Sequence, residues 1–307
     1  MNTSVKNPVA FDIYQLVSDA IIAQIETGTP PWKKPVLRVR FEDGTTFNRP
    51  CNFVTKRPYE GINTFLLSCT PHTVPMFLTF NQVQALKGSV KKRAKGYLAV
   101  FWKKETVKDI GTDGKEKEKN RFFLTYHKVF NVEDTTLDYR KYIVRETEKP
   151  KKEAAKIESC EAVITGYTNA PKIVISEKDM CYFPVSDKIA VPAFTRFKKG
   201  PEYYHVMFHE MVHSTGHRSR LNREGIEQYN GFGSASYSKE ELIAELGAAF
   251  LDKIAGIDSP DTVTNSAAYI KGWLKPLKDD KKLFFEACSK ATKAVNLILG
   301  SDSAGEH

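Results

Sequence analysis

The sequence predicts an α+β protein made of two domains. The chain has 307 residues, enough for two ordinary domains, and stretches with helical spacing of apolar residues are interspersed with short extended stretches. Charge is divided unevenly, because residues 1–150 contain 25 Lys and Arg against 16 Asp and Glu, whereas residues 151–307 contain 21 of each. We therefore expect a basic mixed α/β domain over 1–150 that ends in a charged linker, and a neutral domain over 151–307.

Composition excludes several classes of protein. No run approaches the roughly 18 apolar residues of a membrane-spanning helix, and the N-terminal stretch MNTSVKNPVAFDIYQ lacks the apolar core of a signal peptide. We expect a cytoplasmic protein without a membrane partner. The five cysteines are scattered and form no CxxC pair, so neither a disulfide framework nor a zinc finger is expected, and all five are predicted to be reduced thiols.

The first half begins with a predicted helix over 11–28, where apolar residues recur at helical spacing until Gly28. Three prolines over 29–36 break regular structure. Residues 48–67 mix turn residues with short apolar runs, and residues 77–90 indicate the end of a strand followed by a short helix.

A hairpin and a linker are predicted next. The stretch YLAVFW at 97–102 predicts a strand, and the chain returns as a second strand over 121–132. Residues 105–121 have balanced charges and an Asp-Gly turn, which is typical of a solvated hairpin tip. The highly charged segment 139–156 contains Pro150 and is predicted to link the domains.

The stretch from 87 to 104 is strongly basic and contains no acidic residue. Cations that neutralise phosphates beside aromatic faces that stack on unpaired bases predict binding of a single-stranded nucleic acid. No sequence specificity is expected, because no helix is predicted here that could read a major groove. The alternative is a solubilising hairpin whose aromatic side chains belong to the core. The candidate DNA-binding residues are Lys87, Lys91, Lys92, Arg93, Lys95, Tyr97, Trp102, Lys103 and Lys104, with Arg57 and Tyr59 from the preceding turn-rich stretch.

The second half is predicted to begin with a helix over 157–167. The stretches PKIVIS at 171–176 and CYFPVSDKIAVP at 181–192 then predict strands. Within the second stretch, residues 187–192 are expected to form an edge strand beside the site described next, where its free backbone groups could pair with an extended peptide. Two further helices are predicted over 269–277 and 281–299.

The motif HEMVH at 209–213 carries the clearest chemistry in the sequence. On a helix, His209 and His213 lie one turn apart on the same face, so both imidazoles can bind one metal ion. Glu210 beside them is the candidate general base for water activated by that ion, which predicts a metallopeptidase site. We expect Zn²⁺, with Mn²⁺ or another divalent ion as alternatives, because a site of two histidines and one glutamate suits several of them.

A third metal ligand has to come from elsewhere in the chain. The metzincin pattern HExxHxxGxxH fails, because Ser219 stands where its last histidine belongs, and His217 comes two residues early. A glutamate from the helix predicted over 237–254, with Ser238 as its N-cap, is the alternative. We assign Glu241 as the third ligand and Glu245 as the carboxylate that orients a ligating histidine, and the two roles could be exchanged.

Two further residues are candidates for stabilising an oxyanion in the predicted site. His217 follows the metal helix, and Tyr237 precedes the acidic pair. His217 also stays a candidate metal ligand.

The chain as a whole resembles the ArdC family of antirestriction proteins. In the second half PKIVIS, YFPVSDKIAVP, FHEMVHSTGHRSRL and EELIAELGAAFL are similar to its zincin-like, polyvalent metallopeptidase-type domain. In the first half YQLVSDAIIAQIETGTPPWKKP, NFVTKRPYEGIN, FLTFNQVQALKGSVKK and VFNVED resemble its N-terminal domain, which is shared with TraC-type plasmid primases. Ser214 departs from the family, in which an aromatic residue commonly follows the second histidine of the motif.

The resemblance implies a protein of a plasmid or other mobile element that binds single-stranded DNA and helps incoming DNA escape host restriction during conjugation. It implies that His209 and His213 bind the metal and that Glu210 is the base. The expected partners are single-stranded DNA and a protein substrate such as a restriction component. The alternatives are a DNA-shielding protein with a structural or vestigial metal domain, and a primase accessory protein.

Overall fold

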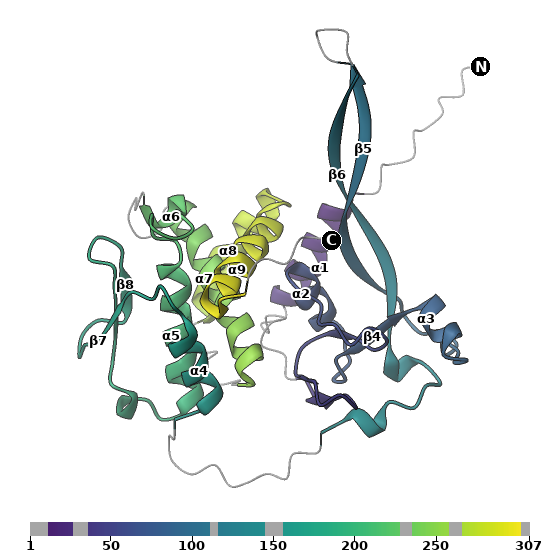
Figure 1. The fold of residues 1–307 in the computed structure, drawn as a ribbon, viewed down its shortest axis with the longest axis horizontal. Coiled ribbons are helices and arrows are strands. Elements are labelled where there is room, and N and C mark those ends of the chain that lie inside the picture. The colour runs from purple at the N-terminus through teal and green to yellow at the C-terminus, as the bar shows by residue number, and fades with distance from the viewer. Residues whose placement is uncertain are drawn as a thin grey trace.

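The computed structural model describes residues 12–26, 36–110, 116–144, 156–227, 235–257 and 266–301. They form two domains of mixed helices and strands, with the first domain on the right of Figure 1 and the second on the left. The helices of the first domain are α1 (Ile13–Glu26), α2 (Ile62–Ser68) and α3 (Phe80–Ala85). Its strands are β1 (Val39–Arg40), β2 (Thr46–Phe47), β3 (Cys51–Asn52), β4 (Met76–Thr79), β5 (Tyr97–Ile110) and β6 (Glu116–Asn131), and its short 3₁₀ turns are η2 (Val132–Asp134) and η3 (Arg140–Tyr142).

The first domain is organised around a four-stranded sheet with the order β3-β4-β6-β5. Strands β5 and β6 pair antiparallel along their whole length and project as a long hairpin well beyond the rest of the molecule (Figure 1). The prediction that residues 105–121 form only a hairpin tip was wrong, since β5 continues to Ile110 and β6 begins at Glu116. The backbone register runs without a break from Tyr97 opposite Val129 to Ile110 opposite Glu116, which balanced composition alone did not indicate.

The second domain contains a helical layer and a small sheet. Its helices are α4 (Glu158–Gly166), α5 (Gly200–Ser214), α6 (Glu224–Glu227), α7 (Ala235–Ala255), α8 (Ser266–Asp279) and α9 (Leu283–Leu299), with a 3₁₀ turn, η4, at Phe194–Arg196. Its strands are β7 (Lys172–Ile175), β8 (Cys181–Phe183) and β9 (Lys188–Val191). Helix α7 begins at Ala235, so the predicted N-cap at Ser238 was wrong and that serine lies inside the helix.

The strand predicted to form the edge of the small sheet occupies its centre. The order is β7-β9-β8, and β9 pairs parallel with β7 and antiparallel with β8. The expectation for residues 187–192 was therefore wrong, because β9 has a strand on each side and Ile189, Ala190 and Val191 are consecutively buried. Strand β8 forms one edge of the sheet and packs against α5.

One apolar cluster joins helices of both domains. Val17 and Ile21 from α1 and Phe65 from α2 are buried in the same cluster as Phe250 of α7 and Phe284 of α9. The Phe65 ring lies 4.7 Å from that of Phe250 and 5.7 Å from that of Phe284. Helices α1 and α2 of the first domain therefore form part of the hydrophobic core of the second domain.

A smaller cluster packs beneath strands β1 to β4 of the first domain. Tyr142 stacks at an angle on Phe41, with 5.4 Å between the ring centroids, and Ile143 bridges to Val39. Ordered packing of the first domain thus continues into the beginning of the predicted linker, whose residues 145–155 lie outside the described part of the chain, as does Gly28 at the expected end of α1.

Two expectations from composition can be compared with the described residues. All five cysteines are free thiols, as predicted. Among the described helices, none combines the length and apolar character needed to cross a membrane.

Candidate metal centre

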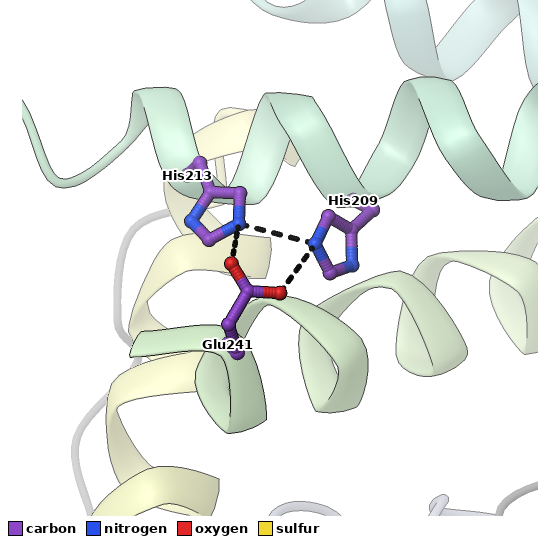
Figure 2. A group of neighbouring side chains, drawn as sticks. All are labelled: His209, His213 and Glu241. Carbon is purple, nitrogen blue, oxygen red and sulfur yellow. Dashed lines mark hydrogen bonds and ion pairs between the residues drawn. The ribbon is translucent and has the colours of Figure 1, made fainter. Parts of the chain in front are cut away.

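Helices α5 and α7 bring three potential metal ligands together. His209 and His213 lie on one face of α5 because residues four apart are one helical turn apart. Figure 2 shows the Glu241 carboxylate, from α7, between their imidazoles. Nε2 of His209 is 3.1 Å from Nε2 of His213, and the two Glu241 oxygens are 3.5 Å from Nε2 of His209 and 3.3 Å from Nε2 of His213. Ligand atoms of all three residues lie within 4.8 Å of one another.

A glycine allows the two helices to approach this closely. A Cβ atom at Gly247 of α7 would lie only 2.7 Å from Cγ2 of Val212 on α5. Val212 is fully buried and precedes the ligand candidate His213. Because this contact leaves no room for a methyl group, Gly247 sets the distance at which α7 can present Glu241 to the imidazoles.

Each imidazole meets a carboxylate at its other ring nitrogen. Nδ1 of His209 lies 3.8 Å from Oε2 of Glu245, and Nδ1 of His213 lies 3.4 Å from Oε1 of Glu240. A carboxylate beside Nδ1 favours the tautomer that carries its proton there, which leaves the Nε2 lone pair to face the centre. Both histidines are thereby oriented to bind a cation through Nε2.

The charges of the centre suit a cation. Burial raises the pKa of Glu241, but hydrogen bonds with His209 and His213 outweigh it and hold the pKa well below its usual range. Burial likewise lowers the pKa of His213, and contacts with Glu240 and Glu241 overcome it and raise the pKa to about 10, so a cation that binds Nε2 displaces a proton from that ring. Two imidazole nitrogens and one ionised carboxylate are donors that Zn²⁺ and Mn²⁺ accept, so the residues present fit a divalent ion.

Glu210 is fixed by the backbone of strand β8. Its Oε2 accepts a hydrogen bond of 2.7 Å from the backbone N–H of Tyr182, and the side chain is buried. The hydroxyl of Tyr182 in turn donates to Asp187 at 2.7 Å, and Arg220 forms an ion pair with Asp187. Arg220 also donates from Nε to the Ser214 carbonyl at 2.7 Å, so the β8–β9 hairpin is tied to the end of the helix that carries the motif.

Of the two residues predicted to stabilise an oxyanion, the structure describes the side chain of one, His217. His217 follows α5 and contacts Ser219, with Nδ1 2.7 Å from the hydroxyl oxygen. Within the described part of the chain, His217 does not belong to the group of potential metal ligands. Tyr237 lies in α7, but its side chain falls outside the described residues.

Sequence reasoning missed four side chains that surround the centre. Arg223, buried behind α5, binds the Glu240 carboxylate through Nε and Nη2 and donates from Nη2 to the Val212 carbonyl at 2.8 Å. His205 and Asp252 lie behind Glu245. The spacing of His205, four residues before His209, was a readable signal of a shared helix face. No spacing in the sequence indicated the contact between Arg223 and Glu240.

The predicted DNA-binding residues fall into three places. Lys103, Lys104 and Trp102 lie on the projecting hairpin, where 48 % of the Trp102 side chain is exposed and the Lys103 ammonium lies 5.6 Å from the Phe123 ring centroid. Arg57 is exposed next to β3, at the edge of the sheet opposite to β5. Five exposed basic residues occupy the loop between α3 and β5, namely Lys87, Lys91, Lys92, Arg93 and Lys95.

The aromatic candidates differ in how accessible they are. Tyr97 is half-buried beside His72, and Tyr59 is only 8 % exposed in a cluster with Phe77 of β4. Lys91, in the loop, donates from Nζ to the Glu133 carbonyl at 2.7 Å. The hairpin therefore offers the most open combination of basic and aromatic side chains.

Comparison with known proteins matches two families to two separate parts of the chain. Residues 158–290 match the zincin-like metallopeptidase family, and residues 11–130 match the N-terminal domain of the anti-restriction factor ArdC. The chain is therefore a two-domain protein in which an ArdC-type N-terminal domain precedes a zincin-like metallopeptidase domain. It belongs to the ArdC family of antirestriction proteins.

Solved structures and sequence relatives support that membership. The crystal structure of metal-free antirestriction ArdC from plasmid R388 superposes with a TM-score of 0.73 at 32 % identity, covering 94 % of this chain and 97 % of that one. The Mn(II)-bound structure of the same protein gives a TM-score of 0.73 at 31 % identity, covering 94 % and 98 %. Protein y4eC of Sinorhizobium fredii (strain NBRC 101917 / NGR234) is 31 % identical over 95 % of this chain and 93 % of its own length. DNA primase TraC of Escherichia coli is 29 % identical over 93 % of this chain, which spans 27 % of that primase.

Proposed function

We propose that this protein is an antirestriction factor of a mobile element, which binds single-stranded DNA without sequence specificity and carries a metal-dependent peptidase site. Membership of the ArdC family supports the antirestriction role. The observation that carries the peptidase site is the convergence of two Nε2 atoms and one carboxylate within 4.8 Å, beside a buried glutamate.

In this proposal His209, His213 and Glu241 hold one divalent cation. We propose Zn²⁺, because two histidines and a glutamate with a position left open form a common catalytic zinc site. Manganese is the alternative, and the R388 relative has a Mn(II)-bound structure. Such an ion polarises a scissile carbonyl and lowers the pKa of a water molecule that it contacts.

The protein's own groups supply the remaining chemistry. Glu210 accepts the proton of the attacking water on its carboxylate, and the Tyr182 N–H keeps that carboxylate oriented beside the imidazoles. Glu245 and Glu240 hold the two rings so that Nε2 faces the centre. In this arrangement a protein bound to the same DNA is the proposed substrate.

Glu210→Gln tests the hydrolytic part. The variant keeps the shape of the side chain but cannot accept the proton, so we expect hydrolysis of a labelled, unfolded casein to fall by about 100-fold or more. The affinities for Mn(II) and for single-stranded DNA should stay within about twofold of wild type, since a direct proton role leaves binding unaffected. Unchanged hydrolysis would exclude Glu210 as the base.

The same variant tests whether antirestriction depends on peptide hydrolysis or on shielding of the DNA. Plasmid transfer into a restricting host, relative to a non-restricting host, measures antirestriction directly. We expect Glu210→Gln to lose this protection. Full protection by the variant would mean that DNA shielding is the function and that hydrolysis is incidental to it.

The hairpin is the proposed core of the DNA-binding surface. Trp102→Ala removes an exposed aromatic face, and base stacking of about 1–3 kcal/mol predicts roughly 5-fold to 150-fold weaker binding of oligothymidine.

Replacing Lys103 and Lys104 with alanine should lower the slope of log affinity against log salt concentration by roughly 0.7 for each lost phosphate contact. Val185→Ala, at a fully exposed apolar residue of the second domain, is the matched control. If the hairpin variants kept the wild-type affinity and salt dependence, the DNA would have to bind to another surface of the protein.

A further inference from the structure

The metal centre continues into a longer row of alternating imidazoles and carboxylates. Helix α5 presents His205 one turn before His209, on the same face. Nε2 of His205 lies 3.5 Å from Oε2 of Glu245, the oxygen that also lies 3.8 Å from Nδ1 of His209. Nδ1 of His205 lies 2.7 Å from Oδ2 of Asp252, on the same helix as Glu245. The row Asp252, His205, Glu245 and His209 therefore runs between α5 and α7 into the centre.

The two ligand candidates differ in what stands behind them. The carboxylate behind His213 belongs to Glu240, and Arg223, which is always charged, holds it in place. The carboxylate behind His209 belongs to Glu245, and His205 contacts that carboxylate from the other side. His205 therefore contacts the carboxylate behind His209 as Arg223 contacts the carboxylate behind His213.

Burial makes such a neighbour necessary. The side chains of His205 and Glu245 are only 12 % and 11 % exposed. A carboxylate shielded from water depends on the groups that contact it for its charge and its orientation, and loss of one of them weakens both. Asp252 fixes the His205 ring at Nδ1, so the opposite nitrogen, Nε2, faces Glu245.

Asp252 also has a feature that packing does not explain. Its Oδ1 is buried and forms no hydrogen bond with any residue in the described part of the chain. A buried polar atom without a partner costs about 1–3 kcal/mol. The other oxygen of Asp252, Oδ2, lies 2.7 Å from Nδ1 of His205, and Oε1 of Glu245 is buried without a hydrogen bond to a described residue in the same way.

We infer that His205 and Asp252 are positioning residues of the metal centre, which fix Glu245 and through it the Nδ1 proton and ring orientation of His209. This inference rests on the proposed metal site. His205 and Asp252 contact neither the substrate nor the reacting atoms. Their effect is on how tightly the centre binds a cation.

The test measures the affinity of the full-length protein for Mn(II) and Zn(II) by titration calorimetry after removal of metal with a chelator. Loss of a carboxylate that orients a histidine ligand typically weakens metal binding by about 10-fold to 100-fold, which is the expected effect of Glu245→Gln. For His205→Gln we expect at least about a 5-fold loss, and a smaller loss for the more conservative Asp252→Asn. His127→Gln, an exposed histidine of the first domain, should leave the affinity unchanged.

A double variant distinguishes positioning from general support of the fold. If His205 acts through Glu245, then His205→Gln should weaken metal binding by less than about twofold when Glu245→Gln is already present. The inference would be overturned if His205→Gln or Asp252→Asn lowered the melting temperature but kept the wild-type metal affinity. Absence of metal binding by the wild-type protein would instead refute the proposed metal centre.

Discussion

At the scale of single residues, each imidazole of the centre is held from two sides. Its Nε2 faces the Glu241 carboxylate, and its Nδ1 faces Glu245 or Glu240. These contacts come from side chains on two helices, so the orientation of each ring depends on how α5 and α7 pack. The spacing of the HExxH motif predicted which residues share a face, because that spacing is a property of one helix. It could not predict Arg223, whose contact with Glu240 depends on tertiary packing.

The charged state of His205 gives a prediction for pH. Burial lowers its pKa, but Asp252 and Glu245 outweigh burial and raise the pKa from its ordinary 6.5 to about 10. A group whose pKa rises on folding stabilises the native state fully at pH values below its unfolded pKa, and this contribution is lost as pH rises through the folded pKa. The window therefore lies between the two values, on the alkaline side of neutrality.

We expect the free energy of unfolding of the metal-free protein to decrease more steeply with pH in wild type than in His205→Gln across that window. One additional proton bound in the native state corresponds to a slope of up to about 1.4 kcal/mol per pH unit. Urea denaturation at several pH values measures the difference. Parallel pH profiles for the two proteins would show that His205 is not charged in the native state.

At the scale of elements, the distance between α5 and α7 decides whether a metal centre can form. The sequence predicted both helices and the face that carries Glu241, since apolar residues recur at helical spacing in each. It did not show that Gly247 of α7 lies against Val212 of α5, because this is a contact between helices. The edge position of β8 was also missed, because the order of strands in a sheet is decided by pairing between segments.

Gly247→Ala tests that close approach. The added methyl group would lie 2.7 Å from Val212, so the helices must separate, and we expect a loss of stability of about 1–3 kcal/mol together with weaker Mn(II) binding. Val212→Ala in the same chain removes the overlapping atoms. The double variant should therefore be more stable than the sum of the two single effects predicts, and purely additive effects would contradict the proposed contact.

At the scale of the whole molecule, the two domains share part of their core. Composition predicted two units from their different charge, since net charge is summed along the sequence. It could not reveal that Phe65, far from the metal motif, packs against Phe250 and Phe284. The first and second domains are consequently coupled through α1, α2, α7 and α9.

Phe65→Ala should disturb both halves together. Removal of a fully buried aromatic ring costs about 3–5 kcal/mol, and the shared cluster distributes that loss over both domains. We expect one denaturation transition, with the same midpoint when it is followed by DNA binding and by metal binding. Phe80→Ala, at a half-exposed ring of α3 away from the hairpin tip, is the control for loss of a ring. Two separate midpoints would show that the domains unfold independently.

The central claim is that His209, His213 and Glu241 bind one divalent ion, and anomalous X-ray diffraction from crystals grown with Mn(II) or Zn(II) tests it most directly. We predict a single anomalous peak between α5 and α7, at about 2.0–2.2 Å from Nε2 of both histidines and from a Glu241 oxygen when the ion is zinc. An ordered crystal without a peak there, or with its peak at other side chains, would contradict the claim.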